Sequence, residues 1–263
     1  MAESEEQEWV EAPGGWGESS GDDNDDGCEE SGFDLFADND PQDSFSFTVS
    51  GSTAATTTKL HLSGFKLDSD ETAQSTGVTL WKESPRLATY IQEAKDELIV
   101  GKSVLELGAG LGLCGIVSHH LGADRVIMTD ADTITLQQMR ENVAKNCPET
   151  ITNRTSTAES PGIIDCRQLI WNTQLEAFHE KHGKFDTILG AAVIYTRDSI
   201  DPLFDTVSFF LQKSQGRFVL SRWSKWGGVT DEDVLEYAKD RNLTWTQPSE
   251  GIFVMQMKKE DKK

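Results

Sequence analysis

The fold of this chain is decided by one stretch, Ser103-Val-Leu-Glu106-Leu-Gly108-Ala-Gly110-Leu-Gly112-Leu. The apolar run at 104–107 predicts a short buried strand, and the apolar residues after Gly112 predict a helix. Glycines at 108, 110 and 112 let the backbone turn tightly and let a ligand approach atoms that a Cβ would block. A strand, a glycine-rich turn and a helix in this order predict a ligand-binding loop, although the spacing alone does not name the ligand.

Strands and helices alternate on the C-terminal side of this loop. We predict strands at 104–107, 126–129, 185–191, 218–221 and 252–257, and helices at about 112–121, 132–146, 199–213 and 231–241. This order predicts an α/β fold with a mostly parallel sheet and helices on both faces.

A second pattern lies on the N-terminal side of the loop. Phe45, Phe47 and Val49 alternate with polar residues, as do Leu60 and Leu62, which predicts an N-terminal β-hairpin. Apolar residues at helical spacing from 87 to 98 predict a helix whose first turn contains Pro85.

The net charge of −21 is concentrated in one segment. Residues 1–50 hold 16 of the 45 acidic residues and none of the 24 basic ones, so the remaining 213 residues carry only −5. We expect residues 1–42 to be a disordered acidic tail, which could attract a basic partner, and residues 43–263 to form one domain. The charge argues against nucleic-acid binding.

Targeting and metal signals are missing from the sequence. The N-terminus has neither a basic nor an apolar signal region, and no run is long enough to span a membrane. The four cysteines have no metal-ligand spacing, so we expect no metal. We expect a cytoplasmic protein, with the nucleus as an additional location, no membrane association, and a monomer by default.

Two acidic residues narrow the identity of the ligand. Glu106 lies at the end of the first strand, where its charge disfavours a pyrophosphate and suits a cation or a hydroxyl. Asp130 ends the next strand, a position from which a carboxylate hydrogen-bonds both ribose hydroxyls of a nucleoside. Together they favour S-adenosylmethionine over the alternative of structural glycines with capping acids. We expect Asp132 to be the N-cap of the following helix.

Trp171 and Tyr195 follow later strands. Trp171 could supply the flat apolar wall that a nucleobase needs, or could simply pack in the core. Tyr195 is our candidate catalytic residue, shaping the channel for the methyl acceptor, with simple packing as its alternative.

Several blocks together resemble the seven-β-strand protein methyltransferases of family 16. They are TLWKESPRLATY (79–90), VLELGAGLGLCGI (104–116), VIMTDAD (126–132) and NVAKN (142–146), and the resemblance covers roughly residues 58–257. It implies a Rossmann-like, seven-stranded class I methyltransferase fold and S-adenosylmethionine as cofactor. It implies that the cofactor is bound by Trp81, Glu106, Gly108, Gly110, Gly112, Asp130 and Trp171; we add Ala191 to this set.

The sequence departs from the family pattern at two places. The family's Leu-Asp-Trp-Gly reads Leu169-Ile-Trp-Asn172, and Ala192 stands where the family often carries an aspartate beside the acceptor. The resemblance as a whole implies a protein methyltransferase that acts on lysine in a substrate with a basic surface, although Ala192 removes one feature that favours lysine. Two alternatives stay open: a different nucleophile is methylated, or Asp198 or another acid takes the place of the family's aspartate. The alternative function is a cofactor-binding pseudo-enzyme or scaffold that engages a basic partner through the tail.

Overall fold

A computed structural model describes residues 42–50, 57–148, 162–212, 215–223 and 228–258 of the chain. The predicted acidic tail, residues 1–42, lies outside the described residues except for Gln42. No helix in the described part of the chain is long and apolar enough to cross a membrane.

Seven strands form one sheet in the order β5-β4-β3-β6-β7-β9-β8. Their bounds are β3 (Ser103–Leu107), β4 (Arg125–Asp130), β5 (Ile163–Gln168), β6 (Thr187–Ala191), β7 (Arg217–Ser221), β8 (Leu243–Ser249) and β9 (Ile252–Met257). The first five strands are parallel, whereas β9 runs antiparallel to β7 and β8 antiparallel to β9. The strand order reverses at β3, which lies between β4 and β6, and ligands of α/β sheets bind at such a reversal.

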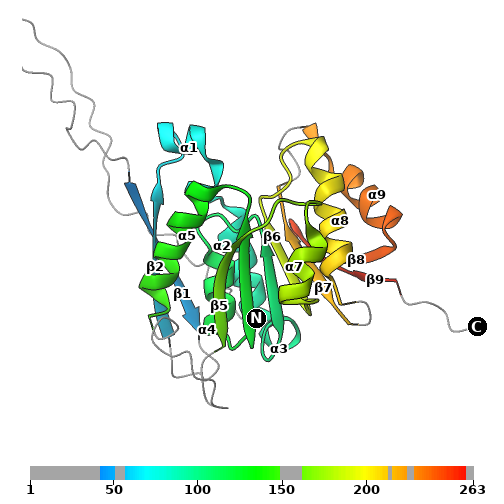
Figure 1. The fold of residues 1–263 in the computed structure, drawn as a ribbon, viewed down its shortest axis with the longest axis horizontal. Helices are drawn as coiled ribbons and strands as arrows, with labels where there is room; N and C mark the ends of the chain where they lie inside the picture. The colour runs from blue at the N-terminus through cyan, green and yellow to red at the C-terminus, as the bar shows by residue number, and fades with distance from the viewer. Residues whose placement is uncertain (1–41, 51–56, 149–161, 213–214, 224–227, 259–263) are drawn as a thin grey trace, which may run out of the picture. The chain divides into compact units, whose positions relative to one another are not determined.

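Successive residues of a strand point to opposite faces of the sheet. Apolar side chains therefore lie on both faces, and helices cover both. Val104 belongs to the core that includes α2 (Glu83–Glu93), α4 (Leu113–His120) and α5 (Thr133–Asn146). Leu105 belongs to the other core, with α7 (Leu175–His182), α8 (Ile200–Phe210) and α9 (Asp231–Asp240). Figure 1 places α5 and α8 on opposite sides of the central strands. The predicted seven-stranded, Rossmann-like α/β fold is confirmed.

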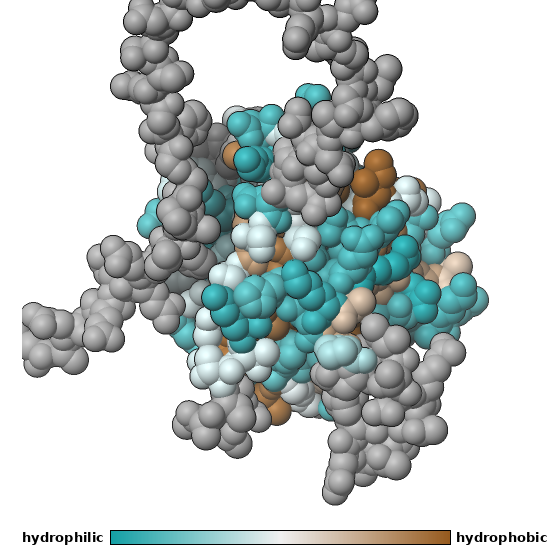
Figure 2. All heavy atoms as spheres, turned by 90° about the vertical axis from the view of Figure 1, so that its left-hand side faces the viewer, coloured by the Kyte–Doolittle hydropathy of each residue, from teal (hydrophilic) through white to brown (hydrophobic). Residues whose placement is uncertain are grey.

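The predicted N-terminal hairpin is present as a separate two-stranded sheet of β1 (Gln42–Ser50) and β2 (Thr57–Phe65). Two side chains of α5 bind the edge of β2. Asn142 accepts from the Ser63 N–H at 2.8 Å and donates to the Ser63 carbonyl at 3.0 Å, and Asn146 does the same at His61. Where described residues are in view, Figure 2 shows this side of the molecule as mostly hydrophilic, with small separate hydrophobic areas.

The structure differs from the predicted elements at several places. The helix predicted through residue 98 ends at Glu93 and resumes as α3 (Lys95–Leu98), because the backbone at Ala94 leaves the helical conformation. Strand β8 was not predicted: only Leu243 of it is buried, so it lacks alternation, and its edge position tolerates Pro248. Helix α7 was also not predicted.

Candidate active site

The glycine-rich loop follows β3 as predicted, and its backbone requires glycine. Gly108, Gly110 and Gly112 have φ of +62°, +55° and +86°, which L-residues with a side chain rarely adopt. A Cβ on Gly108 would lie 2.9 Å from Val193 Cγ1, and one on Gly110 would lie 3.1 Å from the Gly77 carbonyl oxygen. The loop is therefore held close to neighbouring segments on two sides.

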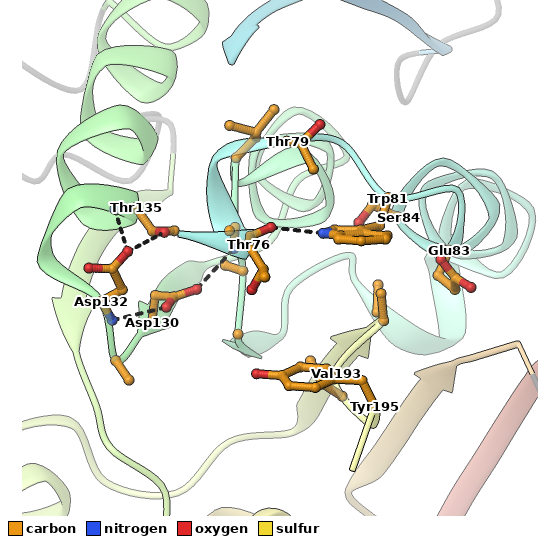
Figure 3. A pocket seen from close by; sticks show the side chains of 18 of the residues that line it. Thr76, Thr79, Trp81, Glu83, Ser84, Asp130, Asp132, Thr135, Val193 and Tyr195 are labelled. Atoms are coloured by element: carbon orange, nitrogen blue, oxygen red, sulfur yellow. Dashed lines mark hydrogen bonds between the residues drawn. The ribbon is translucent and has the colours of Figure 1, made fainter. Parts of the chain in front are cut away.

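Asp130, at the end of β4, is fixed against this loop. Its carboxylate accepts hydrogen bonds from the Gly110 N–H at 3.2 Å and the Asp132 N–H at 3.1 Å (Figure 3). Burial raises the pKa of Asp130, and hydrogen bonds from the backbone of Gly110, Ala131 and Asp132 oppose that rise. Because one carboxylate oxygen bonds the loop and the other bonds the next turn, the side chain has a set direction beside the cavity.

Asp132 is the N-cap of α5, as predicted. It accepts hydrogen bonds from the backbone N–H groups of Ile134 and Thr135 and from the hydroxyls of Ser75 and Thr135. Partial burial acts to raise the pKa of Asp132, but these hydrogen bonds outweigh it and lower the pKa.

Glu106 lies beneath the loop rather than at the cavity wall, which differs from the expectation that it points into the crevice. Only 2% of the residue is exposed, and its carboxylate accepts from the Gly115 N–H in α4 at 2.7 Å. Burial raises the pKa of Glu106 to about 8, so the group holds a proton at neutral pH. A protonated carboxyl at the start of α4 supports the loop from below without adding charge.

A cavity of about 740 Å³ opens at the carboxyl ends of the parallel strands. Seven of the predicted site residues line it: Trp81, Gly108, Gly110, Asp130, Trp171, Ala191 and Tyr195. Glu106 and Gly112 do not line it. Trp171 lies against the loop, since its Cζ2 atom would be 3.4 Å from a Cβ on Gly108. Seven of the nine predicted site residues thus line one cavity, and their roles in binding stay predictions.

One wall of the cavity was not predicted. It comes from the segment after β2, where α1 (Asp70–Gln74) and a 3-10 turn (Thr76–Val78) lead into α2. The Thr76 carbonyl accepts from the Trp81 indole N–H at 2.8 Å (Figure 3). The Ser75 hydroxyl donates to the Asp132 carboxylate and hydrogen-bonds the Thr135 hydroxyl. Ser69, which caps α1 through the Thr72 N–H, was the available signal for this short helix.

The far end of the cavity surrounds Tyr195. Ala192 has φ of +56°, a left-handed conformation that is uncommon for alanine, and its N–H donates to the Ser221 carbonyl at 3.0 Å. The strand therefore turns sharply after Ala191. Tyr195 is 53% exposed, and Trp223, which also lines the cavity, is 42% exposed. These two aromatic residues lie where a large partner could reach the cavity.

Comparison with known proteins places the chain in a family. Residues 62–233 match the family model described as lysine methyltransferase. The chain is 34% identical over 160 residues to protein N-lysine methyltransferase METTL21A of Xenopus tropicalis, covering 61% of this chain and 66% of the relative. It is 38% identical over 128 residues to the same protein of Mus musculus, covering 49% and 52%. The chain thus spans less than two thirds of the length of these relatives.

Solved structures support the fold. The protein SMU.776, solved in complex with SAH, superposes with a TM-score of 0.50 at 10% identity, covering 75% of this chain and 54% of that one. The residues matched by the family model begin in β2 at Leu62 and end in the first turn of α9. They include the glycine loop and the residues that line the cavity. The resemblance predicted from the sequence is confirmed, and the chain belongs to the lysine methyltransferase family.

Proposed function

We propose that this chain is an S-adenosylmethionine-dependent methyltransferase that acts on lysine side chains of proteins. The observation that carries the proposal is the single cavity in which the glycine loop and the fixed carboxylate of Asp130 meet an exposed aromatic opening at Tyr195. Membership of the lysine methyltransferase family and the names of the relatives support the same reaction.

The residues of the cavity fit the nucleoside half of the cofactor. Asp130 has set carboxylate oxygens that could accept from ribose hydroxyls, and Trp171 and Ile170 offer apolar surface to the adenine. Gly108 and Gly110 line the cavity, and a side chain at either position would collide with Val193 or Gly77, so the loop presents bare backbone to a ligand.

Positioning is the main task of the protein groups. S-adenosylmethionine supplies a methyl group on a positively charged sulfonium, which leaves as a neutral thioether when the acceptor nitrogen attacks in line. The protein must hold the acceptor and the methyl carbon about 3–3.5 Å apart. It must also favour the uncharged amine, whose ordinary pKa is about 10.4, at the moment of attack. Tyr195, beside the opening, would shape the acceptor channel.

Two measurements test the proposal: binding of the cofactor and identification of the methylated product. The purified full chain should bind S-adenosylmethionine in a calorimetric titration. With labelled cofactor it should then label proteins in a cell lysate, with mass spectrometry locating the methyl group on lysine. Gly110→Arg is the matched control and should label nothing.

Two results would contradict the proposal. Cofactor binding without any labelled protein, at high enzyme concentration, would favour the pseudo-enzyme alternative, for which the apolar side chain of Ala192 is the supporting feature. A methyl group on histidine, arginine, a nucleic acid or a small molecule would contradict the lysine assignment.

We also propose that the acidic N-terminal residues attract a basic protein substrate. The 16 acidic residues before residue 51 are unmatched by any lysine or arginine in that segment. Deleting residues 1–42 should leave cofactor affinity unchanged and weaken substrate binding, most clearly at low salt. The expected cytoplasmic or nuclear location and the monomeric state stay predictions.

A further inference from the structure

Three carboxylates line the cavity, and they differ in how they are held. Asp130 bonds the backbone of the loop, and Asp132 bonds the start of α5 and Ser75. Glu83, in the first turn of α2, makes no hydrogen bond and no ion pair within the part of the chain that the structure describes. The cavity therefore contains one carboxylate whose partner the described protein groups do not supply.

Glu83 is largely removed from solvent. Only 5% of the residue is exposed, although its side chain is part of the cavity wall. Its carboxylate oxygens are therefore reached through the cavity, where water or the cation of a ligand can meet them. A glutamate in a first helical turn is often stabilised by the helix dipole. That explanation does not account for a side chain that lines a cavity and accepts nothing from the N–H groups of its own helix.

Two arginines near this part of the cavity have other partners and form no ion pair with Glu83. Arg222, 2% exposed, pairs with Asp231 and donates to the Val229 carbonyl at 2.8 Å, whereas its Nε has no hydrogen-bond partner among the described residues. The Arg86 guanidinium lies 5.4 Å from the centroid of the Trp223 ring. Neither forms an ion pair with Glu83, so the complementary cation is expected to arrive with a ligand.

The position of Glu83 indicates which part of a ligand it would meet. In Figure 3, Glu83 lies beyond Trp81, on the side of the cavity away from Asp130. A nucleoside held at Asp130 would thus direct its other end, or the incoming acceptor, toward Glu83. No group of three or more potential metal ligands occurs among the described residues, which disfavours a metal as the cation.

We propose that Glu83 binds a primary ammonium group inside the cavity. This inference rests on the proposed function, which supplies two sources of that chemistry: the α-ammonium of the cofactor's amino-acid end and the ε-ammonium of a substrate lysine. A compact ammonium with three N–H donors fits Glu83, the one of the three cavity carboxylates without a hydrogen bond among the described residues. Glu83 then positions the charged end of a ligand, as Asp130 positions the sugar.

The experiment compares Glu83→Gln with wild type by calorimetric titration of the full chain. The probes are S-adenosylhomocysteine, which carries the α-ammonium; methylthioadenosine, which lacks the amino-acid end; and n-butylammonium, titrated with and without S-adenosylhomocysteine. Glu93→Gln is the matched control, because Glu93 is exposed on the same helix and does not line the cavity.

We expect Glu83→Gln to weaken one ammonium-bearing probe at least tenfold while methylthioadenosine binds as it does to wild type. Weaker S-adenosylhomocysteine binding would show that Glu83 binds the α-ammonium of the cofactor. Weaker n-butylammonium binding, with unchanged affinity for S-adenosylhomocysteine, would show that Glu83 binds the ε-ammonium of the acceptor lysine. Glu83→Asp keeps the charge and should retain more ammonium affinity than Glu83→Gln, and it serves as the second variant if the glutamine variant does not fold.

The inference is overturned if Glu83→Gln binds all probes as tightly as wild type does. It is also overturned if the affinity for methylthioadenosine falls as much as the affinity for S-adenosylhomocysteine. The latter would mean general damage to the cavity. A wild-type chain that binds neither nucleoside would instead refute the proposed function, and n-butylammonium alone would still report on Glu83.

Discussion

The two ends of the cavity are built in different ways. At the Asp130 end, each carboxylate is hydrogen-bonded to backbone N–H groups, and the glycine loop is held by close contacts. At the Tyr195 end, the side chains are exposed aromatic residues, an alanine in a left-handed conformation, and a glutamate with no described partner. The first end has its geometry before any ligand arrives, whereas the second leaves polar groups for a ligand to satisfy.

This difference teaches where each kind of specificity resides. Fixed donors and acceptors give high discrimination against a ligand that lacks the matching groups. An open aromatic rim accepts varied surfaces and discriminates less by itself. We therefore expect changes at the Asp130 end to act on cofactor affinity and changes at the Tyr195 end to act on methyl transfer.

Gly110→Arg should have the largest effect. The backbone at position 110 has φ of +55°, and a Cβ there would lie 3.1 Å from the Gly77 carbonyl oxygen, so any side chain strains the loop and a long one fills the cavity. Cofactor affinity should fall at least about 100-fold, equivalent to about 3 kcal/mol. Calorimetric titration measures this, with circular dichroism as the control for folding; wild-type affinity in a folded variant would contradict the assignment of the loop.

Asp130→Ala should weaken cofactor binding by about 10- to 100-fold, since a hydrogen bond to a charged group contributes about 1.5–3 kcal/mol. Asp132→Ala is the comparison variant. It removes the N-cap of α5 and should cost about 1 kcal/mol of unfolding free energy, with a smaller loss of cofactor affinity. If the two variants lose equal affinity, the ribose assignment of Asp130 is wrong.

Tyr195→Ala should leave cofactor affinity unchanged and lower kcat/KM for protein methylation about tenfold, or about 1.4 kcal/mol of transition-state stabilisation. Because Tyr195 is 53% exposed, its removal should change the unfolding free energy by no more than about 0.5 kcal/mol. Parallel titrations and initial-rate measurements separate these outcomes. An unchanged rate would show that Tyr195 only packs at the rim.

Glu106→Gln should have the smallest effect on binding, because Glu106 lies below the cavity wall. Its effect should appear in the pH dependence of stability. Burial raises the pKa of Glu106 from 4.5 to about 8, so between these values the folded chain keeps a proton that the unfolded chain has released. The wild type should therefore lose stability relative to the variant as pH rises through this window, with a slope of up to about 1.4 kcal/mol per pH unit. Chemical denaturation at several pH values measures the difference; parallel pH curves would contradict it.

The parts of the site that could be predicted are those written in short local patterns. The glycines, Asp130 after its strand and Asp132 as an N-cap each depend on a few neighbouring residues, and each lies where the pattern placed it. The direction of Glu106 could not be predicted, because the residue is in a strand and either the cavity or α4 could have received its side chain.

The rest depends on contacts between segments that are distant in the sequence. The wall made by Ser75 and Thr76 forms because α5 and Trp81 meet that segment. Glu83 could not be separated from an ordinary surface glutamate, since only the packing of α2 buries it. Strand β8 was missed because its pairing with β9, rather than its own hydrophobic pattern, makes it a strand.

Asn142 connects the hairpin to the glycine-rich loop. Its side-chain amide donates both to the Ser63 carbonyl in β2 and to the Leu111 carbonyl at the end of the glycine-rich turn. A ligand that steadies this turn should therefore slow the opening of the hairpin's inner edge. The amide of Ser63, which donates to the Asn142 side chain, should then exchange its hydrogen with deuterated solvent more slowly when the cavity is filled. Hydrogen exchange at Ser63 would therefore report, at a distance from the cavity, whether a ligand is bound.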